Sequence, residues 1–220
     1  DDVRAHVRAE MEKEGITILT GCTVDKINKH GREFTSHLSD GSSVASDQVL
    51  FAIGRHPNVA NLGLETAGVA INPKNGGIAV DGFSRTNVPH IYAIGDVTHR
   101  INLTPVAIRE GHAFADTVFG KKSICVDHAD IPTAVFSQPE VGTVGLTEAQ
   151  ARAQFTGVDV YKATFRPMKA TLSGRDTRIL MKLVVDATTD RVLACHIVGD
   201  GAPEMVQVLG IAIKMKATKA

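Results

Sequence analysis

The sequence predicts an α/β segment followed by an α+β domain that is built on an antiparallel sheet. Two almost continuously apolar runs, residues 48–53 and 90–94, each stop at a glycine, as expected of strands that are covered on both faces. Further along, residues 158–165, 178–186 and 191–198 show the alternating or apolar character of paired strands, and helices are predicted before and after them. This mixture indicates helices packed against sheets.

The composition is that of an ordinary globular protein with no electrostatic bias. The 220 residues carry 24 basic and 24 acidic side chains, which gives a formal net charge of zero. Nucleic acids and anionic membranes attract proteins that have a net positive field over one face, so neither is an expected partner. No apolar run approaches the about 20 residues of a membrane span. We therefore expect a cytoplasmic protein.

Three cysteines, Cys22, Cys125 and Cys195, are odd in number and lie far apart. No Cys-x-x-Cys pair is present among them, so neither a disulfide framework nor a cysteine-based metal site is expected.

The first elements are a helix and a β-meander. Residues 2–14 place Val3, Val7 and Met11 four apart among charged residues, with a glycine after the last turn, which predicts an amphipathic helix. A short β-rich run follows at residues 16–20.

The stretch 23–53 alternates apolar and polar residues in three pieces. The breaks at residues 30–32 and 39–42 have turn chemistry, so a meander is predicted, with residues 48–53 as its third strand.

The middle of the chain is rich in loops and then turns helical. Residues 58–88 are polar and contain many glycines, and the second buried strand, residues 90–94, ends at Gly95 and Asp96. Thr104 at a helix N-cap and Pro105 at the first helical position predict the start of a helix. A polar linker at residues 121–131 leads to a domain boundary before Pro132.

The last part reads as strands and helices in alternation. Strands are predicted at residues 133–137 and 141–145, and a capping box at residues 147–150 starts a helix over residues 148–155. Three strands and a final helix that opens near Pro203 complete the order. That helix is apolar over most of its circumference, so burial on more than one side is expected.

Residues 91–96 carry the most informative chemistry. A strand that ends in Gly95 and Asp96 places a carboxylate at the carboxyl edge of a sheet, where nucleotides bind in α/β folds. This carboxylate suits a sugar or ribitol hydroxyl, and the helix from Thr104 offers its positive end to the negative charge of a reduced flavin. The alternative is that Asp96 only caps a turn.

A second strand ending, at residues 49–58, has the same form. Gly54 suits a close approach of a nucleotide to the backbone, and the alternative is a tight turn between layers. Two such endings in this order, followed by the helix opening at residues 103–107, are more specific than either one alone.

These motifs resemble those of the flavoprotein pyridine nucleotide–disulfide oxidoreductases, over the whole chain. Residues 51–55 and 91–96 match the family's two late cofactor motifs, and residues 132–148 match its dimerisation domain. Three further stretches resemble the glutathione reductase branch of the family rather than the dihydrolipoamide dehydrogenase branch: residues 165–169, 171–175 and 211–215.

The resemblance implies a division of the chain and a set of partners. Residues 1–55 would end an NADPH-binding domain, residues 56–130 would form a central segment that contacts FAD, and residues 131–220 would form most of a dimerisation domain. A homodimer through the last segment is implied, with FAD and NADPH as cofactors and glutathione disulfide as substrate.

The resemblance also implies roles for single residues. Asp96 would bind the FAD ribitol, and the backbone at Thr104 would meet the pyrimidine edge of the flavin. Gly54 would lie near NADPH, with Asn102 and Ala134 lining the nicotinamide side.

His112 occupies a position where some relatives carry an arginine that contacts glutathione. It would therefore face the substrate, although it lies on the polar side of its helix and could simply be solvated.

The family's chemistry passes a hydride from NADPH to FAD, then reduces an enzyme disulfide, which reduces glutathione disulfide with help from a histidine. The redox cysteine pair, the Gly-x-Gly-x-x-Gly loops and the His-Pro-Thr segment of the family do not occur in these residues. The chain is thus expected to be the later half of a larger flavoenzyme. Alone it is expected neither to turn over substrate nor to hold FAD tightly, and no catalytic residue is assigned in it.

Three alternatives stay open from the sequence. The parent protein could be another disulfide reductase, such as a trypanothione or mercuric reductase. The chain could act purely as a dimerisation module. It could also belong to a flavin electron-transfer protein without thiol chemistry.

Overall fold

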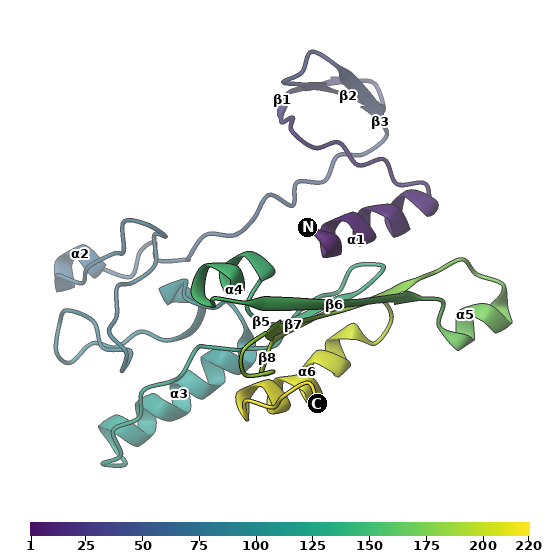
Figure 1. Ribbon diagram of the computed structural model, residues 1–220. Coiled ribbons are helices and arrows are strands. Elements are labelled where there is room, and N and C mark those ends of the chain that lie inside the picture. The colour runs from purple at the N-terminus through teal and green to yellow at the C-terminus, as the bar shows by residue number, and fades with distance from the viewer. The chain divides into compact units, whose positions relative to one another are not determined.

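A computed structural model describes all 220 residues, which separate into two compact units. The first, called here the sheet unit, comprises residues 1–46 and 129–220, and the second, the loop unit, comprises residues 47–128. Figure 1 shows the elements of each. None of the helices is long and apolar enough to cross a membrane.

The sheet unit contains a five-stranded antiparallel sheet in the order β4-β5-β8-β7-β6. The predicted fold class is confirmed, and each predicted strand of this sheet ends within two residues of the observed one. The observed strands are β4 (Thr133–Val135), β5 (Val141–Gly145), β6 (Val158–Phe165), β7 (Ile179–Asp186) and β8 (Val192–Val198).

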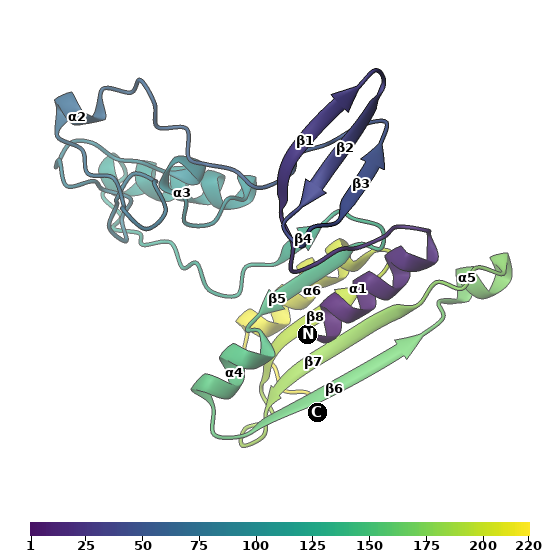
Figure 2. The ribbon, with the colours of Figure 1, turned by 90° about the horizontal axis from the view of Figure 1, so that it is seen from above.

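Helices cover both faces of this sheet (Figures 1 and 2). Helix α6 (Ala202–Lys214) packs on one face, where Val206 and Ile213 meet Cys195 and Ile197 in the largest apolar cluster. The other face carries α1 (Asp2–Lys13) and α4 (Glu148–Gln154), and its buried contacts include these side chains: Val3, Val7, Ala151, Leu180, Val184 and Val198.

The outer side of α6 differs from the prediction. The sequence indicated burial on more than one side, but the sheet covers only one face of the helix, and Val208, Ile211 and Met215 are exposed. This leaves an apolar surface on the sheet unit.

The predicted signals at helix ends and starts are confirmed in the sheet unit. Gly15, just after α1, has a φ of +83°, a conformation that suits the predicted glycine at a helix end. The capping box at α4 is present, because the Thr147 hydroxyl accepts from the Gln150 N–H at 3.2 Å and the Gln150 side chain accepts from the Thr147 N–H at 2.9 Å. The short helix α5 (Met168–Ser173) was not predicted.

The meander forms with a shifted third strand. Strands β1 (Val24–His30), β2 (Glu33–Leu38) and β3 (Ser43–Ser46) pair in sequence order, whereas residues 48–53 and 16–20 form no strand. Leu50 and Ile53 are 90% and 92% exposed, so the prediction of a buried strand is wrong for this chain. An apolar run becomes a strand only where a neighbouring strand supplies backbone partners, and none does so here.

The loop unit holds α2 (Leu64–Ala67), the 3₁₀ turn η1 (Gly95–Thr98) and helix α3 (Thr104–Val118). Residues 90–94 are not a strand: they make a single bridge, from Tyr92 to Arg85, although Ala93 is buried in a small apolar cluster. Helix α3 begins at Thr104, but Leu103 is its N-cap, so the predicted cap lies one residue too late.

A buried lysine joins both helices of one face to the sheet. Lys182 on β7 has a side chain that is 5% exposed, and its Nζ lies 2.6 Å from carboxylate oxygens of both Asp2 and Glu148. The hydrogen bonds that Asp2 accepts from Lys182 and Lys162 lower the pKa of Asp2 to about 2. The hydrogen bond from Lys182 to Glu148 is the largest of the causes that lower the pKa of Glu148.

Lys182→Met is expected to reduce the pH dependence of stability. A carboxyl whose pKa is lower in the folded than in the unfolded state stabilises the fold above its unfolded pKa, so this contribution is present above about pH 4 and is lost toward pH 2. We expect the variant to lose about 1–2 kcal/mol at pH 7 and to show a shallower loss on acidification. Urea unfolding of the 220-residue chain at several pH values measures both. The matched control is Lys162→Met, whose native ammonium is half exposed and for which a smaller change is expected. An unchanged acid slope in Lys182→Met would contradict this account.

Candidate functional site

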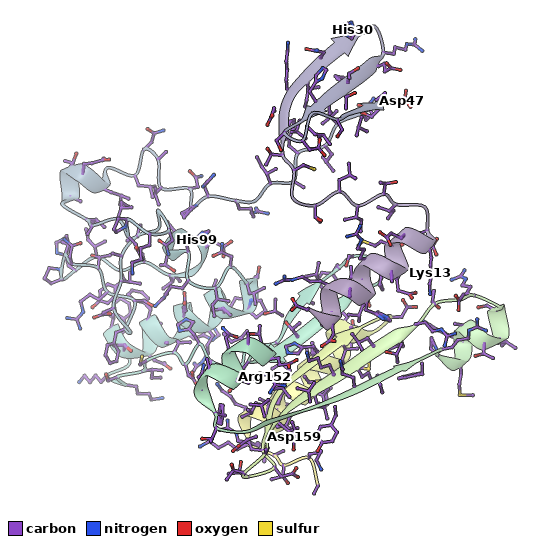
Figure 3. All side chains as sticks on the ribbon, turned by 45° about the horizontal axis from the view of Figure 1, so that its top comes forward. Lys13, His30, Asp47, His99, Arg152 and Asp159 are labelled. Atoms are coloured by element: carbon purple, nitrogen blue, oxygen red, sulfur yellow. The ribbon has the colours of Figure 1, made fainter.

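A polar pocket in the loop unit brings together two of the predicted site residues. It has a volume of about 200 Å³, and Asp96 and Asn102 both line it. The turn that follows Asp96 also contributes His99, which is labelled in Figure 3. The rest of the lining was not assigned by the sequence and comprises Arg55, His56, Pro57, Asn58 and Val97.

The turn that carries Asp96 depends on Gly95. This glycine has a φ of +68°, and a Cβ at its position would lie 2.9 Å from the Cβ of Ala107 on α3. Glycine is therefore required by the backbone conformation and by the close contact with helix α3.

A buried carboxylate lies beneath this turn. Glu110 on α3 is 1% exposed, and it accepts a hydrogen bond from the Gly95 N–H at 2.6 Å. Its other oxygen lies 2.8 Å from Arg100 and 2.7 Å from His128. Burial raises the pKa of Glu110, but the Gly95 and His128 hydrogen bonds and the charge of Arg100 outweigh it and hold the pKa below its usual value.

Arg100 connects the turn to a neighbouring loop. Its guanidinium donates to the Ser84 hydroxyl at 3.0 Å, to the Thr98 hydroxyl at 3.3 Å and to the Asp81 carbonyl at 3.4 Å. Together with Glu110, it holds the chain on both sides of Asp96.

Sequence reasoning missed this charged network, although one signal for it exists. Val106, Glu110 and Ala113 are the buried residues of α3, and they are spaced as neighbours on one helix face. A glutamate among buried apolar positions requires a partner, which a sequence alone does not identify.

The other predicted site residues lie outside the lining of the pocket. Thr104 is the first residue of α3, where the helix itself leaves backbone N–H groups unpaired. Gly54 has a φ of +118° with open space around its Cβ position, so its conformation and not crowding favours glycine. His112 is exposed on α3, and Ala134 on β4 pairs opposite Gly142 within the sheet unit.

All three cysteines are free thiols. Cys195 is buried among apolar side chains, which raises its pKa to about 11. Because the thiolate is the reactive form, this group is inert near neutral pH.

Comparison with known proteins identifies the class. Residues 1–111 match the model of the pyridine nucleotide-disulphide oxidoreductases, and residues 131–220 match the dimerisation domain of the same family. The chain belongs to the pyridine nucleotide-disulphide oxidoreductases, which confirms the resemblance seen in its motifs. FAD and NADPH are the cofactors of this family and of its glutathione reductases.

Three individual relatives show how similar the chain is to single members of the family. The chain is 50% identical over 220 residues to glutathione reductase from Burkholderia cepacia, covering all of this chain and 49% of that protein. It is 43% identical over 218 residues to trypanothione reductase from Trypanosoma congolense, covering 98% of this chain and 44% of that one. The solved structure of the HOCl-induced flavoprotein disulfide reductase RclA from Escherichia coli matches with a TM-score of 0.87 at 26% identity, covering 99% of this chain and 50% of that chain. The chain thus spans about half the length of the relatives it matches.

Proposed function

We propose that this chain supplies the FAD-facing segment and the dimerisation domain of an NADPH-dependent glutathione-disulfide reductase. The observation that carries the proposal is the pocket lined by Asp96 and Asn102, in which the turn that carries Asp96 is held by the buried Glu110 and its ion pair with Arg100. The glutathione branch is favoured by the 50% identity to a glutathione reductase, against 43% to a trypanothione reductase.

The residues of the pocket fit part of FAD. The exposed carboxylate of Asp96 can accept hydrogen bonds from ribitol hydroxyls, and Arg55 supplies a guanidinium that suits phosphate oxygens. A volume of about 200 Å³ admits a portion of a dinucleotide and not the whole. The start of the 15-residue helix α3, at Thr104, favours negative charge near it.

When bound, FAD would accept a hydride from NADPH and pass the electron pair on to a disulfide. In this proposal Gly54 lies near NADPH, and Asn102 and Ala134 line the nicotinamide side. His112 is proposed to face glutathione. The 220 residues alone are proposed to be inactive, and a cytoplasmic location belongs to the same proposal.

A homodimer through residues 131–220 completes the proposal. An apolar groove of about 710 Å³ lies between α6 and strands β6, β7 and β8, and Met205 and Val208 of α6 line it. The exposed outer side of α6 adjoins this groove. A second copy of the chain would remove both surfaces from water, which is a favourable process.

The test uses the complete protein encoded by the gene that contains this chain. NADPH oxidation is followed with glutathione disulfide, trypanothione disulfide or Hg²⁺ as acceptor, and the same sample is sized by light scattering. We expect a dimer that oxidises NADPH fastest with glutathione disulfide.

Each other outcome favours a different alternative. Preference for one of the other two acceptors would contradict the glutathione assignment, and a flavin-free dimer would favour a pure dimerisation module. A flavoprotein that reduces none of the three acceptors would favour electron transfer without thiol chemistry. A protein that is strictly monomeric in light scattering would contradict the proposed homodimer.

A further inference from the structure

Glu110 is the most deeply buried charged side chain of the loop unit, and nothing in the proposed reaction uses it. It faces three groups: the Gly95 N–H, the guanidinium of Arg100 and the ring of His128. All of these lie within the loop unit. A carboxylate placed in this way acts on the conformation of the segments that it joins.

We propose that Glu110 is a positioning residue that fixes the Asp96 carboxylate in the geometry needed to bind the ribitol of FAD. The inference rests on the proposed function and names how its binding pocket is held. Gly95 directly precedes Asp96, so the backbone dihedral angles of Gly95 decide where the carboxylate points. Glycine has several backbone conformations open to it, and the 2.6 Å hydrogen bond to Glu110 selects one of them.

Arg100 and His128 strengthen this bond, because both favour the ionised form of Glu110. A lone carboxylate that is 1% exposed would be costly to keep ionised. Arg100 and His128, at 2.8 Å and 2.7 Å, keep it charged, and a charged acceptor holds an N–H more firmly than a neutral one.

Arg100 extends the effect to the other side of Asp96. It donates to the Thr98 hydroxyl, which in turn donates to the Gly95 carbonyl at 2.7 Å. Both the N–H and the carbonyl of Gly95 are therefore held by the same network. These two hydrogen bonds restrict the backbone conformation of the residue that precedes Asp96.

The chain contains a matched comparison in the sheet unit. Glu10 is also buried, at 7% exposure, and it accepts from a backbone N–H, that of Arg178 at 3.1 Å, and from Lys13 at 2.7 Å. It lines neither of the two cavities described above. A variant of Glu10 therefore reports the loss of a buried carboxylate without any change at the pocket.

The experiment compares Glu110→Gln, Glu110→Leu and Glu10→Gln in the complete protein. FAD is removed and titrated back, the quenching of its fluorescence gives Kd, the absorption band of bound flavin reports its surroundings, and thermal unfolding reports stability. Leucine removes the acceptor, so we expect Kd to rise about tenfold or more. Glutamine keeps a neutral acceptor for the Gly95 N–H, so about threefold is expected, with the absorption band shifted less than in Glu110→Leu.

Glu10→Gln is expected to lower thermal stability and to leave Kd and the flavin spectrum unchanged. Wild-type FAD affinity and spectrum in both Glu110 variants would overturn the inference, and so would an equal loss of affinity in Glu10→Gln. A wild-type protein that binds no FAD at all would overturn the proposed function itself, which distinguishes the two failures.

Discussion

Gly145→Ala is expected to destabilise the sheet unit by about 3 kcal/mol or more. Gly145 ends β5, opposite Ala194 of β8, and has a φ of +84°. A Cβ at this position would overlap the carbonyl oxygen of Leu193 and lie 2.8 Å from the Cα of Ala194. Both are backbone atoms of the paired strand, so the overlap can be relieved only by moving β5 away from β8. Urea unfolding followed by circular dichroism of the 220-residue chain measures the loss.

Gly174→Ala is the matched control for this substitution. Gly174 has a φ of +72°, but no atom lies within 4 Å of its Cβ position. Only the cost of a left-handed conformation applies there, about 1 kcal/mol. Equal losses in the two variants would show that the contact between β5 and β8 is not the cause.

Asp96→Asn is expected to weaken FAD binding by the complete protein about tenfold or more. Asparagine has nearly the same shape, so the change removes the charged acceptor and leaves the turn and the support of Glu110 in place. NADPH-dependent reduction should fall with the fraction of flavin bound and recover at saturating FAD. Fluorescence titration of the apoprotein and steady-state rates at several FAD concentrations measure the two effects.

Asp116→Asn is the control for charge removal. Asp116 lies on α3 outside the lining of the pocket, and its substitution should leave FAD affinity unchanged. Wild-type affinity in Asp96→Asn, or an equal loss in both variants, would be incompatible with a flavin bound at Asp96.

The sheet unit could be predicted well because its signals are local. Residues 158–165 were predicted as a strand and form β6 with the same bounds, since their alternation and the flanking turn residues lie within a few positions of one another. The capping box at Thr147 is likewise set by residues three apart. Such elements need no knowledge of distant partners.

The failures concern partners that are distant in sequence. The apolar run at residues 48–53 indicated burial, but a strand also needs a neighbour, and this requirement is not visible in the run itself. The outer side of α6 was assigned as buried for the same reason. In both cases hydrophobicity predicted that a surface would be covered without showing what covers it.

The candidate site was predictable in part. The Gly-Asp ending singled out Asp96, and the structure brings Asn102 into the same pocket. The network that holds the Asp96 turn was not predictable, because its members, Glu110, Arg100 and His128, meet only after folding. The roles assigned to Asp96, Gly54, Thr104, Asn102, Ala134 and His112 stay predictions.

A crystal structure of the complete protein with FAD tests the central claim most directly. The account predicts one FAD per chain, with a ribitol hydroxyl within hydrogen-bonding distance of the Asp96 carboxylate and the Gly95 N–H still bonded to Glu110. FAD bound away from Asp96, or a protein that crystallises without flavin from an excess of it, would contradict the account.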